Sequence, residues 1–125
     1  MKLIHDGRKY KVYSRVKLPK AFLDSDEKGY LYFIRIGQDV YKIGTACDVL
    51  RRMIQHCKYY ENEIYILWIS PPLSKYTTLR IEERTKKIWK TFEGWEYKNN
   101  DRFIIPDNVK ELTIKIKKDY SFSIV

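Results

Sequence analysis

Cysteine and histidine are scarce in this sequence, which has two of each among its 125 residues. Cys47 and Cys57 are both predicted to lie in one helix, where ten residues span about 15 Å. A disulfide requires Cα atoms within about 7 Å of each other, so both thiols are expected to be free. The two histidines are far apart in the chain. No Cys/His zinc site is therefore predicted.

Long apolar runs are also missing. No stretch of about 18 apolar residues occurs, so the sequence predicts no membrane-spanning helix. The first seven residues turn polar too early to supply the apolar segment of a signal peptide. Together with free thiols, which are typical of a reducing compartment, these absences predict a cytoplasmic protein with no membrane partner.

Basic and aromatic side chains, by contrast, are abundant. The chain has 25 Lys and Arg against 16 Asp and Glu, which gives a formal net charge of +9. A domain this basic is expected to bind a polyanion, and we expect DNA, with RNA as the alternative. The apolar fraction of 44% and the aromatic fraction of 15% exclude intrinsic disorder and predict a single domain over residues 1–125.

Apolar periodicity predicts a mixed α+β fold. Tyr30–Ile36 and Val40–Gly44 are rich in aromatic and β-branched residues and flank a short turn, so they predict a hairpin. Glu63–Ile69 is apolar on both faces and is expected to be a central strand. The predicted class is therefore α+β, with a central three-stranded antiparallel sheet flanked by helices and with added N- and C-terminal β-hairpins. The other predicted elements are a basic hairpin in 1–17, a connector in 17–28, a helix starting at the Thr45–Asp48 cap, a helix over 78–92, and a hairpin formed by 112–116 and 120–124.

The predicted first hairpin places Tyr32 and Lys42 on one face of the sheet. If Ile36 pairs with Val40, then Tyr32 pairs with Gly44, and Lys42 becomes the diagonal neighbour of Tyr32. An ammonium beside a phenol lowers the phenol's pKa from about 10, which would make Tyr32 a usable general base. The alternative is a half-buried strand tyrosine beside a solvated lysine.

The two predicted helices carry further polar candidates. Arg52 and His56 lie four residues apart on one flank of the first helix, an arrangement suited to binding and polarising a phosphate. On the second helix Glu82 borders the apolar stripe, whereas Glu83 is almost opposite it and is expected in water. Mg²⁺ commonly accepts one or two carboxylates together with phosphate oxygens, so Glu82 is the candidate metal ligand. Each of these residues, taken alone, is also typical of a solvated helix surface.

Together these residues resemble the motifs of the GIY-YIG nuclease superfamily. Tyr32–Ile34 is similar to the first motif, and Lys42–Thr45 is similar to the second, ten residues later. The family's arginine follows ten residues after that, at Arg52, often with a histidine one helical turn on, at His56. The family's metal-binding glutamate is matched by Glu82. The second motif of the family usually has Tyr where this chain has Lys42, although family members with lysine there still cut DNA.

The resemblance covers residues 29–97, and this part is expected to form a GIY-YIG-like core. Residues 1–28 remain as the N-terminal basic hairpin and connector, and residues 98–125 remain as the C-terminal hairpin. Lys42–Thr45 and Gly94–Tyr97 look closest to a phage-associated branch described as a DNA-binding domain, with the Trp and Glu of the closing motif in swapped order.

The resemblance implies metal-dependent hydrolysis of a DNA phosphodiester bond, leaving a 5′-phosphate and a 3′-hydroxyl. Tyr32 would take the proton of the attacking water, with Lys42 keeping the phenol acidic. The remaining roles are Arg52 as transition-state stabiliser, His56 as the group that orients water or phosphate, and Glu82 as the ligand of Mg²⁺ or Mn²⁺. An open alternative has Lys42 bind phosphate directly, with Tyr41 as an auxiliary hydroxyl.

Basic and aromatic residues outside the catalytic set are candidates for DNA binding. They are Arg8, Lys9, Lys11, Arg15, Tyr41, Arg51, Lys115 and Lys117. An equal alternative is that the flanking cations only keep strand edges from aggregating. The alternative function is a catalytically inactive nucleic-acid-binding module of the same fold, and a third is an interaction protein that binds an acidic partner. A homodimer or a larger complex is compatible with all three.

Overall fold

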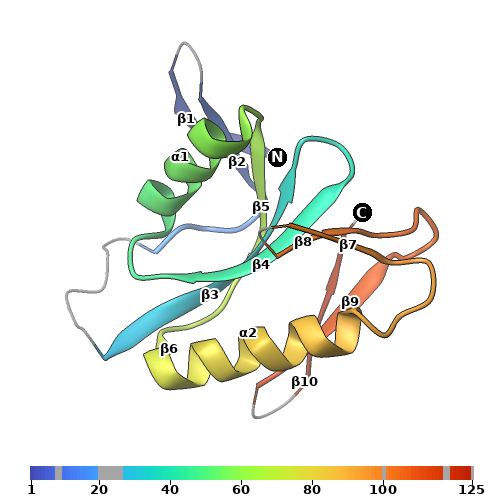
Figure 1. The fold of residues 1–125 in the computed structure, drawn as a ribbon. Helices are drawn as coiled ribbons and strands as arrows, with labels where there is room; N and C mark the ends of the chain where they lie inside the picture. Colours follow the sequence, from blue (N-terminus) through green and yellow to red (C-terminus); the bar gives the residue numbers. More distant parts are fainter. Residues whose placement is uncertain (8–9, 20–26, 100, 117–118, 125) are drawn as a thin grey trace.

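One wide β-sheet carries the fold, and two helices pack against it (Figure 1). The structure is a computed structural model that describes residues 1–7, 10–19, 27–99, 101–116 and 119–124. The predicted α+β class is confirmed. The elements are β1 (Lys2–Asp6), β2 (Lys11–Ser14), β3 (Lys28–Ile36), β4 (Val40–Ala46), α1 (Val49–Tyr60), β5 (Ile64–Ile69), β6 (Leu73–Ser74), α2 (Lys75–Trp89), β7 (Glu96–Lys98), β8 (Arg102–Ile104), β9 (Glu111–Lys115) and β10 (Asp119–Ser123).

The sheet has eight strands rather than the three expected. Its order is β1-β2-β5-β3-β4-β8-β7, with β6 also paired to β3, while β9 and β10 form a separate two-stranded sheet. The antiparallel neighbours β5, β3 and β4 are the predicted centre, but β2 adds to β5 in parallel and β8 adds to β4. Three strands alone leave unpaired backbone groups at both edges, and β2 and β8 satisfy them. The N-terminal hairpin is therefore part of the sheet, not an appendage.

The β3–β4 hairpin has the register expected from its turn. Gly37 is the first residue of the turn and has a φ of 64°, which glycine adopts without strain. The three expected pairs are present, namely Ile36 with Val40, Ile34 with Lys42 and Tyr32 with Gly44. Because paired residues share a face, the side chains of Tyr32 and Lys42 both lie on the face that α1 covers.

Helix α1 begins later than the sequence pattern suggested. Asp48, rather than Thr45, is the N-cap, and its carboxylate accepts a hydrogen bond of 3.1 Å from the Arg51 N–H. Thr45 instead continues β4, which was predicted to end one residue before it. Cys47 therefore precedes the helix and only Cys57 lies inside it, so the expectation of one helix for both was wrong. Both thiols are nevertheless free, as expected.

Helix α2 is shifted toward the N-terminus relative to the prediction of 78–92. The Ser74 hydroxyl caps it by accepting a 3.1 Å hydrogen bond from the Thr77 N–H. The helix ends at Trp89 because the chain then turns toward Gly94, which has a φ of 82°. Phe92, expected on the buried stripe, therefore lies outside the helix and is 42% exposed. Neither helix of the described residues is long and apolar enough to cross a membrane.

Two apolar cores lie on the two faces of the sheet. On one face, Met53 and Cys57 of α1 pack in the same core as Tyr32. On the other, Ile81 and Trp89 of α2 pack with Phe33 and with the C-terminal hairpin β9–β10, which was predicted correctly. Strand β3 is thus buried on both sides, and α1 and α2 approach it from different sides (Figure 1).

Candidate active site

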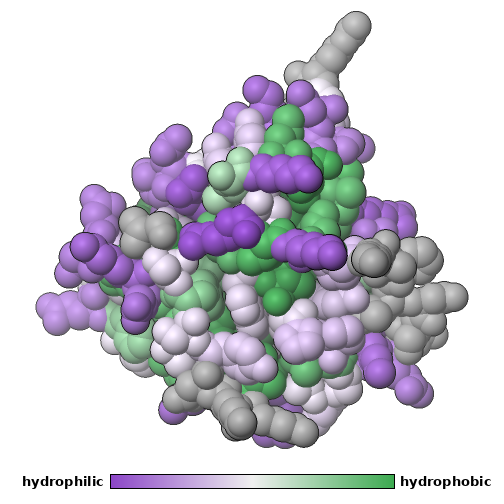
Figure 2. Space-filling model, turned by 180° about the vertical axis from the view of Figure 1, so that it is seen from behind, coloured by the Kyte–Doolittle hydropathy of each residue, from purple (hydrophilic) through white to green (hydrophobic). Residues whose placement is uncertain are grey.

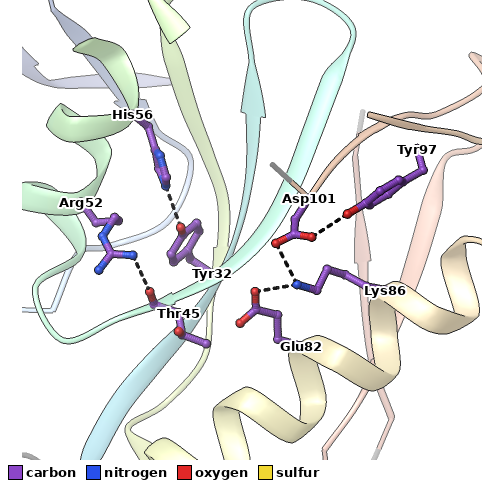
Figure 3. Close-up of polar contacts among 8 residues, drawn as sticks. All are labelled: Tyr32, Thr45, Arg52, His56, Glu82, Lys86, Tyr97 and Asp101. Carbon is purple, nitrogen blue, oxygen red and sulfur yellow. Dashed lines mark hydrogen bonds and ion pairs between the residues drawn. The ribbon is translucent and has the colours of Figure 1, made fainter. Parts of the chain in front are cut away.

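Tyr32 lies at the centre of the candidate site, on the face that α1 covers. It is 1% exposed, and its hydroxyl oxygen is 2.7 Å from Nε2 of His56 (Figure 3). Gly44 pairs with Tyr32 across the hairpin, and a Cβ at this glycine would overlap the phenol ring and its hydroxyl. Packing therefore requires glycine at position 44, because the absence of a side chain there lets the Tyr32 ring lie across β4.

The expected acidification of Tyr32 by Lys42 is not found. Burial raises the pKa of Tyr32 above its usual value, and the opposing charge and hydrogen bond of Arg52 do not offset that effect. Burial likewise lowers the pKa of Lys42, which is 9% exposed. The phenol is therefore protonated at neutral pH, and Tyr32 cannot serve as a base on its own.

His56 is the neutral partner of this phenol. Burial lowers the pKa of His56 to about 4, and the positive charges of Lys42 and Arg52 act in the same direction. Its ring also contacts the ring of Tyr60, with the centroids 5.7 Å apart. At neutral pH the imidazole consequently carries no charge and keeps one nitrogen able to accept a proton.

Arg52 lies one turn before His56 on α1 and is exposed to solvent. Its Nη1 donates to the Thr45 carbonyl at 3.3 Å, which holds the guanidinium beside β4 (Figure 3). Arg52 and Lys75 also line one surface pocket, which lies between the end of β4 and the start of α2. An anion entering this pocket meets two cations from different elements.

Glu82 enters the site from α2 and is already paired with a cation. Its Oε1 is 3.1 Å from Nζ of Lys86, and the same Nζ is 3.0 Å from Oδ2 of Asp101. The Tyr97 hydroxyl donates to Oδ1 of Asp101 at 2.8 Å (Figure 3). The side chains of Glu82 and Lys86 are 13% and 14% exposed, so this pair is largely shielded from water. Glu83 is exposed, as expected.

Sequence reasoning missed Lys86, Asp101 and Tyr97. Lys86 had a usable signal, because it follows Glu82 by four residues on the same helix face. Asp101 had none: it lies in a turn with a φ of 59° and comes close to α2 only because β8 pairs with β4. Tyr97 ends the Gly94–Tyr97 stretch that resembles the family's closing motif, but its contact with Asp101 depends on β7, a strand of three residues that is too short to show alternation.

The donor set at Glu82 fits a divalent ion that takes its other ligands from water, and from a substrate when one is bound. Within the described ranges, no group of three or more His, Cys, Asp or Glu side chains gathers to hold a metal. Mg²⁺ is nevertheless often bound by one or two carboxylates with phosphate oxygens and water. The Lys86 ammonium beside Glu82 shows that this carboxylate already accommodates a positive charge. Glu82 and a bound phosphate would therefore hold the ion jointly.

The DNA-binding candidates are spread over several elements. Arg8, Lys9 and Lys117 lie outside the described residues, whereas Lys11 of β2, Arg51 of α1 and Lys115 of β9 are exposed. Arg15 is exposed too, and its Nη1 donates to the Ser123 carbonyl at 2.6 Å. On the face seen in Figure 2, hydrophilic residues lie around and across hydrophobic ones and are not gathered at one side. No single basic face is therefore defined by these residues.

Tyr41 lies on the opposite side of the sheet from Tyr32. It pairs with Arg35, and its ring stacks on Phe33 with the centroids 5.7 Å apart. Adjacent residues of a strand point to opposite faces, so Lys42 faces Tyr32 while Tyr41 does not. The alternative in which Tyr41 adds a hydroxyl beside Lys42 therefore has no support in this geometry.

Comparison of the chain with protein-family models, with curated proteins and with solved structures found no match. The likeness to GIY-YIG nucleases therefore rests on the motif residues and on their geometry alone.

Proposed function

We propose that the protein is a metal-dependent DNA endonuclease that hydrolyses phosphodiester bonds. The observation that carries the proposal is the part-buried hydrogen bond between Tyr32 and His56, with the charges of Arg52 and Glu82 both acting on Tyr32. Phosphodiester hydrolysis uses a proton acceptor, a cation for the developing charge and a carboxylate for a metal. The three-strand centre β5-β3-β4, from which Tyr32 projects, also supports the GIY-YIG-like assignment.

In this proposal His56 replaces Tyr32 as the final proton acceptor. The attacking water gives a proton to the Tyr32 oxygen while the phenol's own proton passes to Nε2 of His56, 2.7 Å away. This transfer requires the tautomer with a proton on Nδ1, so that Nε2 accepts. The resulting hydroxide forms a bond to phosphorus as the bond to the 3′ oxygen breaks. That oxygen takes a proton from solvent, which leaves a 5′-phosphate and a 3′-hydroxyl.

Substrate binding is expected to make His56 a better base. Burial is the largest cause of its low pKa, and the positive charges of Lys42 and Arg52 lower it further. A phosphate bound against these two residues neutralises them and raises the pKa of His56 toward its ordinary value. Lys75, which lines the same pocket as Arg52, would bind a neighbouring phosphate.

Glu82 is the residue that would hold the metal in this reaction. When bound there, Mg²⁺ or Mn²⁺ would stabilise the negative charge of the leaving oxygen. Tyr32, His56 and Arg52 would then act on the water and the phosphate from the side of α1, with Glu82 on the side of α2 (Figure 3).

A nucleic-acid-binding module without catalysis is the second candidate function. It is favoured by one observation, the ion pair of Glu82 with Lys86, because that pair already neutralises the proposed metal ligand. The two functions differ in what they need from Glu82. A pure binder gains nothing from a carboxylate near phosphate, whereas the nuclease depends on it.

Nicking of supercoiled plasmid tests the proposal. We expect nicking with Mg²⁺, none with EDTA and none with Glu82→Gln, while His56→Gln slows the reaction by about 10²-fold or more. Glu83→Gln is the matched control, since it removes an exposed carboxylate from the adjacent position and should retain full activity. Inert wild-type protein that binds plasmid and branched DNA as tightly as Glu82→Gln would instead establish the binding module.

A further inference from the structure

The Lys86 ammonium lies between two carboxylates at the proposed metal position. It is 3.1 Å from Oε1 of Glu82 and 3.0 Å from Oδ2 of Asp101 (Figure 3). The second carboxylate is fixed in turn, because the Tyr97 hydroxyl donates to its other oxygen at 2.8 Å. With its side chain 14% exposed, Lys86 is a shielded cation with two anionic partners.

A divalent ion and this ammonium compete for Glu82. Mg²⁺ binds a carboxylate oxygen at about 2.0–2.1 Å, so an ion on Oε1 would lie within a few Å of the ammonium. Two positive charges at that separation repel strongly where water is largely excluded. Lys86 must therefore leave Glu82 when a metal binds there.

Asp101 provides the place to which Lys86 moves. The ammonium already contacts Asp101, so it can release Glu82 and keep one ion pair. Asp101 lies 19 residues after Glu82 in the chain, in the turn that precedes β8, so Lys86 joins carboxylates from two different parts of the fold.

We propose that Lys86 is an internal cation that keeps Glu82 closed to the divalent ion, and that Asp101 is the positioning residue that retains Lys86 when the ion enters. This inference rests on the proposed function, because it assumes that Glu82 is the metal ligand. Metal binding is then an exchange of one cation for another at Glu82. Lys86 opposes this exchange, whereas Asp101 favours it.

Binding of Mn²⁺ without DNA, measured by titration calorimetry, tests the inference. We expect Lys86→Met to tighten Mn²⁺ binding by about tenfold. This effect is larger than that of a typical exposed ion pair and smaller than that of a fully buried one. Asp101→Asn should weaken it, because Lys86 then has Glu82 as its remaining carboxylate partner. Lys87→Met and Asp107→Asn are the matched controls, since both remove exposed charges nearby in sequence and should leave binding unchanged.

The double variant separates a positioning role from direct ligation. If Asp101 acts through Lys86, then Asp101→Asn has no further effect once Lys86→Met is present. An equal loss of Mn²⁺ affinity in both backgrounds would make Asp101 a metal ligand and overturn the role given to it here. Unchanged Mn²⁺ affinity in Lys86→Met, or no measurable binding in any variant, would overturn the inference as a whole.

The recovery of thermal stability by Mn²⁺ is a second measurement, and a purely structural role of Lys86 would not produce it. Lys86→Met removes the ammonium that contacts the shielded Glu82 and the partly exposed Asp101, so it should lower the Tm, and Mn²⁺ should restore more of that loss than it adds to wild type. Mn²⁺ affinity and nicking together distinguish a failure of this inference from a failure of the proposed nuclease function. Metal-dependent nicking with unchanged Mn²⁺ affinity in Lys86→Met refutes only the inference, whereas tighter Mn²⁺ binding without any nicking refutes only the nuclease.

Discussion

At the scale of single residues, the site depends on keeping an imidazole neutral beside a phenol. His56 has a pKa lowered to about 4 by burial and by Lys42 and Arg52. The unfolded chain would titrate this group near its usual value of about 6.5. Between these two values the unfolded state binds a proton that the folded state does not, so stability falls as the pH is lowered through this window.

The first prediction concerns this fall of stability at lower pH. The Tm of the wild type should fall as the pH is lowered from 7 to 5, and His56→Gln should fall distinctly less over the same range. Thermal unfolding monitored by circular dichroism at several pH values measures this. His5→Gln is the matched control, because it makes the same substitution at the other histidine of the chain, in β1 and outside the candidate site. Identical slopes for wild type and His56→Gln would show that His56 is not held neutral by the fold.

A second residue-scale prediction concerns the two glycines near the site. A Cβ at Gly44 would overlap the Tyr32 phenol, whereas a Cβ at Gly29 would find its nearest atom, the Ala46 carbonyl oxygen, 3.7 Å away. Gly44→Ala should therefore destabilise the protein by about 1–3 kcal/mol through overpacking and displace Tyr32 from His56. Gly29→Ala should be nearly neutral. Urea unfolding and nicking rates measure both effects, and equal tolerance of the two changes would contradict the packing described for Tyr32.

At the scale of elements, the start of α1 sets the positions of Arg52 and His56. Asp48 caps this helix through its hydrogen bond to the Arg51 N–H. Asp48→Ala should cost about 1 kcal/mol of stability and should loosen the first turn, which carries Arg52. Urea unfolding measures the cost, with Asp107→Ala as a control that removes an exposed carboxylate from a turn. A loss no greater than that of the control would show that the cap contributes nothing.

Elements with a long apolar pattern or a defined turn were predicted from the sequence, whereas very short elements were not. The β3–β4 register was predictable because a short turn with Gly37 at its start fixes the pairing of all the residues that follow. The start of α1 was misplaced because Asp48, and not Thr45 of the same motif, caps it, and the start of α2 was misplaced because Ser74 caps it ahead of the apolar stripe. β7 and β8 span three residues each, too few to show alternation.

The candidate site was predictable only where its residues share an element or a motif spacing. Tyr32, Lys42, Arg52, His56 and Glu82 could be proposed as one set because their spacing resembles that of a known family's motifs. Burial then decides their protonation, and burial comes from the packing of α1 on the sheet, which a sequence pattern does not contain. For this reason the proposed mechanism makes His56, and not the expected Tyr32, the final proton acceptor.

At the scale of the whole molecule, the N-terminal hairpin belongs to the main core. Val12 of β2 is fully buried, and it pairs in parallel with Ile64 of β5. The same core contains Tyr32 from β3 and Met53 from α1. The core that contains Val12 is therefore the same core that packs around Tyr32 in the candidate site.

Val12→Ala tests whether the chain unfolds as one unit. Removing this buried volume should lower the free energy of unfolding by about 1.5–3 kcal/mol, because the cavity is closed on all sides by the core. Val16→Ala, at a half-buried position against the same core, should cost less. Since β2 is hydrogen-bonded to β5 in the middle of the chain, urea unfolding should remain a single transition with an unchanged slope and a lower midpoint. A separate early transition in Val12→Ala would instead show that the hairpin is an independent unit, and Tyr32 and His56 would then keep their contact after the hairpin had unfolded.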